Sequence, residues 1–170
     1  MPAPRSGLPP GLAPWHPAAW LATWLFSGLL PVAPGTWGTL AALPFAWVIA
    51  KLGGGGALVV AALIAFAVGC WAAQVYMRHG GAHDPGAVVI DEVAGLWLTL
   101  AVAPVDGRAY ALGFLFFRLF DILKPWPVGW LDRRVRGGFG VMIDDVAAAV
   151  YAAVALWLST TYLFPLFMNL

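Results

Sequence analysis

The chain has 170 residues, of which 62% are hydrophobic and only 10% charged, whereas soluble domains carry about 25% charged residues, so the composition favours a membrane protein. Nine basic and eight acidic residues leave a formal net charge of +1, which excludes an electrostatic nucleic-acid binder. The single cysteine excludes an internal disulfide and a cysteine-based zinc site.

The first half of the chain is expected to enter the membrane gradually. Frequent prolines prevent a continuous helix in residues 1–17, which we interpret as an irregular tail before a single helical domain over residues 18–170. Residues 18–30 are apolar but too short to cross a bilayer, so we expect them at the interface or partly inserted. Residues 36–52 form the next apolar segment, and four glycines separate it from residues 57–77, a clear spanning candidate without any charge.

The second half alternates apolar segments with polar turns. Residues 87–104 are mainly apolar, residues 106–108 form a turn, and residues 109–123 are expected to run back across the membrane. Residues 124–144 contain several glycines and arginines and are predicted to form a substantial loop. Residues 146–170 carry no charge and are the second clear span.

The predicted crossings bring every acidic residue except Asp106 to one membrane face. Most basic residues of the connecting segments fall on the same face, and an excess of Lys and Arg marks the cytoplasmic side. The sequence therefore predicts an all-α integral membrane bundle of about five to six helices, with a polar active site at the cytoplasmic face.

Two pairs of neighbouring carboxylates indicate a metal site. Asp91 and Glu92 form one pair and Asp144 and Asp145 the other, each at the predicted start of an apolar helix. An ionised carboxylate within a bilayer costs at least about 2.5 kcal/mol, and neighbouring like charges add to that cost. Mg²⁺ would stabilise them because it prefers oxygen ligands. Helix capping is the alternative, because an acidic first turn also contacts unpaired backbone N–H groups.

Helical spacing adds further candidates. Arg118 and Asp121 stand three residues apart, so they either form a simple ion pair or point together into one cavity. Gly35, Thr36 and Gly38 fall at a predicted helix start, where backbone N–H groups can bind an anionic oxygen. The same residues also describe a common turn and N-cap.

Four stretches occur in an order that resembles the phosphatidylglycerophosphatase A family, and Asp132 fills a further acidic position of the same family. These stretches are residues 33–40, residues 84–85 with 89–95, residues 117–127 and residues 137–145. The resemblance implies an all-helical, Mg²⁺-dependent lipid phosphatase of the bacterial inner membrane. Its phospholipid substrate would be phosphatidylglycerophosphate, and its products phosphatidylglycerol and inorganic phosphate. Membrane lipids are then its other expected partners.

The resemblance also implies a role for each matching residue. The expected metal ligands are Asp91, Glu92, Asp144 and Asp145. The expected catalytic residues are Asp91, Asp121, Asp144 and Lys124. The expected phosphate-binding residues are Gly35, Thr36, Gly38, Arg118 and Lys124.

Several alternatives remain open at this level. Water could be deprotonated by a carboxylate, or Asp121 or Asp144 could form a covalent aspartyl-phosphate. Another lipid phosphate, such as phosphatidate, could be the substrate. A transporter that binds ions or protons is the alternative of a different class, but its acids should lie at several depths rather than at one face.

Overall fold

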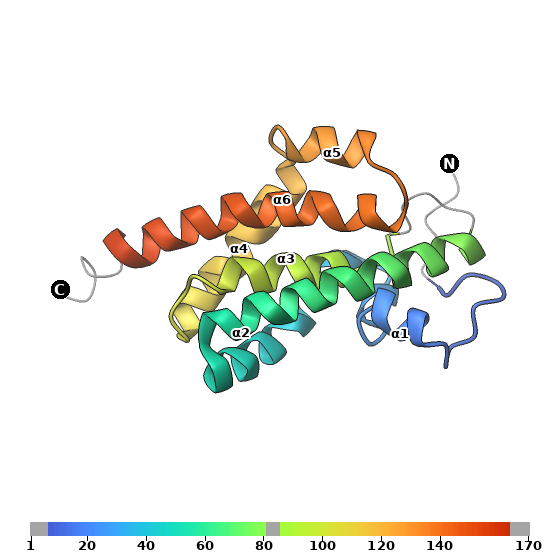
Figure 1. The fold of residues 1–170 in the computed structure, drawn as a ribbon, viewed down its shortest axis with the longest axis horizontal. Helices are drawn as coiled ribbons and strands as arrows, with labels where there is room; N and C mark the ends of the chain where they lie inside the picture. Colours follow the sequence, from blue (N-terminus) through green and yellow to red (C-terminus); the bar gives the residue numbers. More distant parts are fainter. Residues whose placement is uncertain (1–6, 81–85, 164–170) are drawn as a thin grey trace.

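The computed structural model describes residues 7–80 and 86–163, which are helical throughout their regular parts and contain no β-strand. This confirms the predicted all-α class. The described helices are α1 (Pro17–Ala22), α2 (Pro34–Gly80), α3 (Ile90–Leu100), α4 (Gly107–Leu123), α5 (Val128–Arg134) and α6 (Gly137–Leu158), with short turns at Ser27–Leu29 and Ser159–Leu163 (Figure 1).

The predicted glycine break divides α2 into two helical halves. Gly54 has φ 68° and ψ −167°, a conformation that lies outside the helix and that a side chain would disfavour. Figure 1 shows that the chain reverses direction at this break, which lies at one end of the bundle. Gly55 then lies against the carbonyl oxygen of Ala101, which leaves no room for a Cβ atom. The break therefore allows the two halves to pack closely beside the end of α3.

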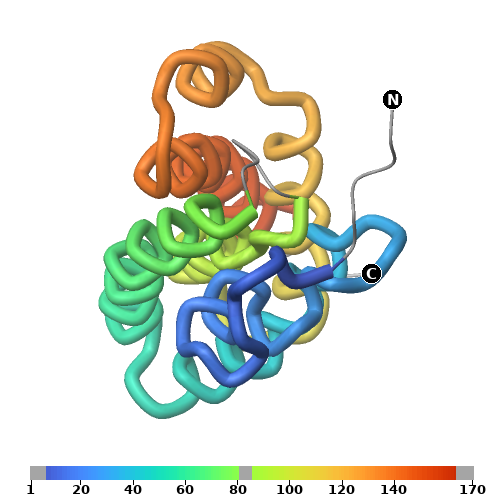
Figure 2. The backbone as a smooth tube through the Cα atoms, turned by 90° about the vertical axis from the view of Figure 1, so that its right-hand side faces the viewer, coloured from blue at the N-terminus to red at the C-terminus, as the bar shows by residue number. Residues whose placement is uncertain are grey.

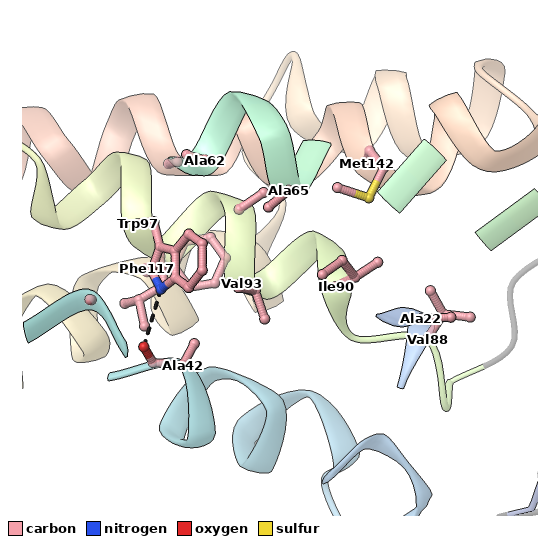
Figure 3. Packing of buried hydrophobic residues seen from close by; sticks show 14 of the residues in the cluster. Ala22, Ala42, Ala62, Ala65, Val88, Ile90, Val93, Trp97, Phe117 and Met142 are labelled. Carbon is pink, nitrogen blue, oxygen red and sulfur yellow. Dashed lines mark hydrogen bonds between the residues drawn. The ribbon is translucent and has the colours of Figure 1, made fainter. Parts of the chain in front are cut away.

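Helix α3 forms the centre of the bundle and packs against both α2 and α6. Most of its side chains are buried, including Leu96 and Leu100. The indole N–H of Trp97 donates a hydrogen bond of 3.1 Å to the carbonyl of Ala42 in α2, as Figure 3 shows. On the other side, Gly69 of α2 packs closely against Ile90 of α3 and Met142 of α6. These contacts fix α3 along its whole length and hold its acidic first turn in a defined place.

Residues 18–30 do not form one helix, and their position at the membrane interface stays a prediction. Helix α1 ends at Ala22, and the hydroxyl of the next residue, Thr23, accepts a hydrogen bond from the N–H of Phe26. Trp24, Leu25 and Phe26 all have positive φ, which costs about 1–2 kcal/mol for each residue. The left-handed turn lets α1 fold back, and the carbonyl of Ala22 accepts the N–H of Val89 just before α3.

Part of the predicted N-terminal tail packs on the bundle. The hydroxyl of Tyr76 in α2 donates to the carbonyl of Gly7, and Leu12 is buried. The division of the chain at residue 17 stays a prediction, because residues 1–6 lie outside the described residues.

The prediction of a long loop over residues 124–144 is wrong. This segment contains α5, and α6 already begins at Gly137, so Asp144 and Asp145 lie two turns inside the helix instead of at its start. The glycines serve close packing here, because Gly138 lies against the carbonyl of Cys70. In Figure 2, α5 lies on the outer side of α6, away from α1.

Two helices, Pro34–Gly80 and the continuous stretch Gly137–Leu163, are long and apolar enough to cross a membrane. The first contains the predicted span 57–77, and the second contains the described part of the predicted span 146–170. Residues 164–170 lie outside the described part. Large apolar side chains such as Leu63, Ile64 and Val154 are exposed on these helices. An apolar surface of this kind suits a lipid environment rather than water.

We expect Gly55→Ala to destabilise the bundle, because the new methyl group would overlap the backbone carbonyl of Ala101. Overpacking of this type costs about 1–3 kcal/mol. The melting temperature in detergent should fall, whereas Gly56→Ala should leave it unchanged or raise it, because no atom lies within 4 Å of a Cβ there. Equal melting temperatures for the two variants would contradict the close approach of α2 and α3.

Candidate active site

The first turn of α3 supplies one pair of acidic side chains. Helix α3 begins at Ile90, so Asp91 and Glu92 follow at once. The N–H of Glu92 donates a 3.0 Å hydrogen bond to Oδ1 of Asp91. The carbonyl of Ala22 fixes the residue before the helix, Val89, through a 2.8 Å hydrogen bond. The two carboxylates are therefore held by the backbone at one end of the bundle.

Helix α6 supplies the second pair. Asp144 and Asp145 are only 5% and 3% exposed, so they belong to the interior of the described bundle. Helix α6 crosses α3 closely at Gly95, where a Cβ would lie 3.1 Å from the carbonyl oxygen of Asp145 and would overlap the ring of Phe117. Gly95 is therefore a point of close approach between α3 and α6.

Three of the carboxylates converge. One oxygen atom each from Asp91, Glu92 and Asp145 lies within 4.8 Å of the others. The central spatial prediction, that acidic residues far apart in the sequence meet at one end of the bundle, is confirmed for this trio. Asp106 lies elsewhere, where its side chain accepts hydrogen bonds from the first N–H groups of α4.

Arg118 connects two of the acidic groups. Its Nη1 lies 2.6 Å from Oδ2 of Asp121 and 3.4 Å from Oε1 of Glu92. The predicted pairing of Arg118 with Asp121, three residues apart on α4, is therefore present. Because Arg118 also contacts Glu92, the pair of Arg118 and Asp121 faces the carboxylate cluster.

Lys124 lies between α5 and α6. Its Nζ is 2.6 Å from Oδ1 of Asp132 and 2.8 Å from Oδ2 of Asp144. Lys124 ends α4 in a left-handed conformation, with φ 44° and ψ 57°, and its position depends on this turn. Burial opposes its charge, but the hydrogen bonds to the two aspartates outweigh burial and raise the pKa of Lys124 above its ordinary value. The side chain is therefore a fixed cation.

A cavity of about 190 Å³ opens between these groups. All acidic residues of α3, α5 and α6 line it together with Asp121 and Lys124. Three buried carboxylate oxygens have no hydrogen-bond partner among the described residues: Oε2 of Glu92, Oδ1 of Asp144 and Oδ2 of Asp145. Buried charged oxygens without partners are costly, and several of them in one cavity suit a hard divalent cation such as Mg²⁺.

The predicted ligand Asp144 differs from the other three. It shares the cavity, but the close trio contains Asp91, Glu92 and Asp145, whereas one oxygen of Asp144 binds Lys124. The other oxygen of Asp144 has no described partner. Its place among the metal ligands therefore stays a prediction.

The three residues predicted at the start of α2 have different surroundings. A Cβ on Gly35 would overlap Oε1 of Glu92 and lie 3.1 Å from Nη1 of Arg118, so this glycine borders the acidic cluster. Gly38 instead packs against Val89, and neither it nor Thr36 lines the described cavity. A role of these residues in phosphate binding stays a prediction.

Two residues were absent from the predicted site. Asp132 holds Lys124 from α5, and the acidic position in the family resemblance was the available signal for it. Gln74 in α2 accepts the N–H of Gly138 through Oε1 at 3.0 Å and so fixes the start of α6. No pattern in the sequence indicates this second contact, because it joins two residues whose proximity depends on the packed fold.

Gly35→Ala should lower catalytic efficiency by about fivefold or more, because displacing a close neighbour of the site costs about 1–3 kcal/mol. The methyl group would displace Glu92 and Arg118. Steady-state phosphate release checks this expectation, with Gly107→Ala as the matched control because no atom lies within 4 Å of a Cβ there. Full activity in both variants would separate the start of α2 from the site.

The fold and the site together are those of a small helical enzyme. Its described part has two candidate membrane-spanning helices and a carboxylate-lined cavity flanked by Arg118 and Lys124. Over residues 20–160 the sequence matches the family described as phosphatidylglycerophosphatase A. The chain belongs to this family and is therefore a phosphoric monoester hydrolase.

Bacterial relatives support this assignment. Phosphatidylglycerophosphatase A of Escherichia coli is 40% identical over 145 residues, which cover 85% of this chain and 82% of the relative. The Haemophilus influenzae protein of the same name is 38% identical over 143 residues, covering 84% and 88%. A Bacteroides thetaiotaomicron protein, provisionally named a phosphatidylinositol-3-phosphatase, is 42% identical over 154 residues, covering 81% and 92%. No solved structure matches the chain.

Proposed function

We propose that this enzyme hydrolyses phosphatidylglycerophosphate to phosphatidylglycerol and inorganic phosphate in a Mg²⁺-dependent reaction. The observation that carries the proposal is the approach of Asp91, Glu92 and Asp145 to within 4.8 Å, beside two cations, in a chain of this family. Both E. coli and H. influenzae relatives bear the name of this activity.

The acidic trio would hold the metal ion. Asp91, Glu92 and Asp145 offer carboxylate oxygens, and oxygens of Glu92 and Asp145 have no other described partner. Asp144 is the fourth proposed ligand. When bound, Mg²⁺ would supply Lewis-acid stabilisation of the charge on the phosphoryl oxygens.

The cations would bind the substrate phosphate. The ammonium group of Lys124 has three N–H donors, and Asp132 and Asp144 occupy two of them, which leaves one for a phosphate oxygen. Arg118 is held by Asp121 and Glu92 and would orient the phosphate from the other side. The start of α2 at Gly35 would add backbone N–H donors.

A carboxylate would accept the proton of the attacking water. Asp144 has one oxygen on Lys124 and one without a described partner, so the second oxygen would serve either as the fourth metal ligand or as the base. Asp91 and Asp121 complete the proposed catalytic group. Protonation of Asp144 would weaken its contact with Lys124, so proton transfer and phosphate binding would be linked through this pair.

We further propose that the helices form a multi-pass bundle in the bacterial inner membrane, with the cavity at the cytoplasmic face. The apolar outer surface of α2 and α6 supports a membrane position. Arg133 and Arg134 of α5 follow Asp132, which lines the cavity, and an excess of basic residues is typical of cytoplasmic loops. A lipid phosphate at that face would reach the cavity while the acyl chains remain in the bilayer.

Phosphate release from purified protein in mixed micelles tests the proposal. The substrates are phosphatidylglycerophosphate, phosphatidate and phosphatidylinositol 3-phosphate, each with Mg²⁺ and with EDTA. The third lipid is included because of the name of the B. thetaiotaomicron relative. We expect the highest kcat/KM with phosphatidylglycerophosphate and no release with EDTA. Preference for another lipid, or full activity in EDTA, would contradict the corresponding part of the proposal.

A further inference from the structure

Helix α5 has two chemically different sides. Val128 is buried and Leu131 is half-buried on the side that packs against α6. Trp130, Arg133 and Arg134 are exposed, and their spacing of three and four residues gives them one common face. Figure 2 shows α5 on the outside of the bundle, and these three side chains are exposed within the described chain. We call Trp130, Arg133 and Arg134 the outer face of α5.

The positive charge of this face is not neutralised within the described chain. The ion pairs of the described residues involve only Arg118 and Lys124 as cations. Asp132, the acidic residue of α5, is already bound to Lys124 and lines the cavity. Two arginines on a short helix are therefore available for an anionic partner immediately beside the cavity.

Apolar side chains next to α5 indicate where the boundary of a membrane would lie. Ile122 and Leu123 end α4 and are 67% and 65% exposed, and Trp126 is 80% exposed in the connection to α5. Aliphatic side chains are stable in hydrocarbon, tryptophan is typical of the headgroup layer, and arginine binds lipid phosphates there. The order from Leu123 through Trp126 to Arg133 follows this change of environment.

We propose that the outer face of α5 is a docking surface for anionic phospholipid headgroups of the surrounding bilayer. This inference rests on the proposed function only in placing the bundle in a membrane. Docking would hold α5 in the headgroup layer. Because Asp132 of the same helix binds Lys124, it would also hold one wall of the cavity at the depth of a lipid phosphate.

Lipid selectivity measured with spin-labelled lipids tests the proposal without any use of activity. The protein is reconstituted in phosphatidylcholine vesicles, and the motionally restricted fraction of spin-labelled phosphatidylglycerol is compared with that of spin-labelled phosphatidylcholine. The test variant is Arg133→Gln/Arg134→Gln. The matched control, Lys51→Gln/Arg108→Gln, also removes two exposed positive charges, but from residues outside α5 and the cavity lining.

We expect the wild-type protein and the control variant to prefer phosphatidylglycerol. In the α5 variant the preference should fall by a factor of about two or more. One basic side chain changes anionic lipid binding about fivefold, but the measured signal averages over all bound lipids and is therefore smaller. Equal preference in all three proteins, or no preference in the wild type, would overturn the proposal. Phosphate release from the same vesicles, after phosphatidylglycerophosphate and Mg²⁺ are added, tests the proposed function separately, so a normal lipid preference without hydrolysis would contradict that function alone.

Discussion

Asp145→Asn is expected to reduce phosphate release by at least about a hundredfold, because even the outer partners of metal ligands cost about 10–100-fold when they are removed. The Asp145 carboxylate lies within 4.8 Å of those of Asp91 and Glu92 and is almost completely buried. The amide retains the size of the side chain but removes its negative charge. The bundle should therefore stay folded, which the melting temperature and circular dichroism would verify.

Asp106→Asn is the matched control for this experiment. It makes the same chemical change at an exposed aspartate that caps α4 and does not line the cavity. Asparagine is also a good N-cap residue, so activity and stability should remain close to those of the wild type. Wild-type turnover of Asp145→Asn would remove the acidic cluster from the mechanism. An equal loss in both variants would indicate a general effect of charge instead.

Lys124→Ala is expected to reduce kcat/KM by about thirtyfold or more, since leaving a buried carboxylate without its charged partner costs about 2–5 kcal/mol. The variant removes the cation proposed to bind the phosphate. It also leaves the buried carboxylate of Asp144 without its 2.8 Å contact to Nζ. The loss should appear in KM as well as kcat, because the lysine is proposed to bind the substrate phosphate itself.

Two further variants separate phosphate binding from packing. Lys124→Arg keeps the positive charge and should recover part of the activity, although its planar group has a different geometry. Lys51→Ala removes an exposed lysine whose ammonium group lies over the ring of Trp47. This variant should leave kcat/KM unchanged. If Lys124→Ala had unchanged kinetics, Lys124 would serve only to hold α5 and α6 together.

The apolar segments and glycine breaks were predictable because each is a local property of the sequence. The glycines before residue 57 indicated the turn that Gly54 makes in α2. The acidic start of α3 was predicted for the same reason. Residues 124–144 were predicted incorrectly, because glycine and arginine are typical of loops. Here Gly138 instead allows α6 to approach the backbone of Cys70, a long-range contact that no local pattern indicates.

The site was predictable to the extent that charge burial determines it. Carboxylates in apolar helices are costly, so the expectation that Glu92 and Asp145 meet followed from energetics together with the order of the crossings. The division of roles did not follow. Asp144 binds Lys124 while Asp145 joins the trio, although the two residues are neighbours, because adjacent side chains on a helix point in different directions.

Direct measurement of divalent-cation binding tests the central claim, that Asp91, Glu92 and Asp145 form a metal site. Mn²⁺ can report on a Mg²⁺ site through electron paramagnetic resonance, since both ions favour oxygen ligands. We predict saturable Mn²⁺ binding that Mg²⁺ displaces, that the variant Glu92→Gln/Asp145→Asn loses, and that Asp106→Asn retains. Undiminished Mn²⁺ binding by the folded double variant, or no binding by the wild type, would contradict the account.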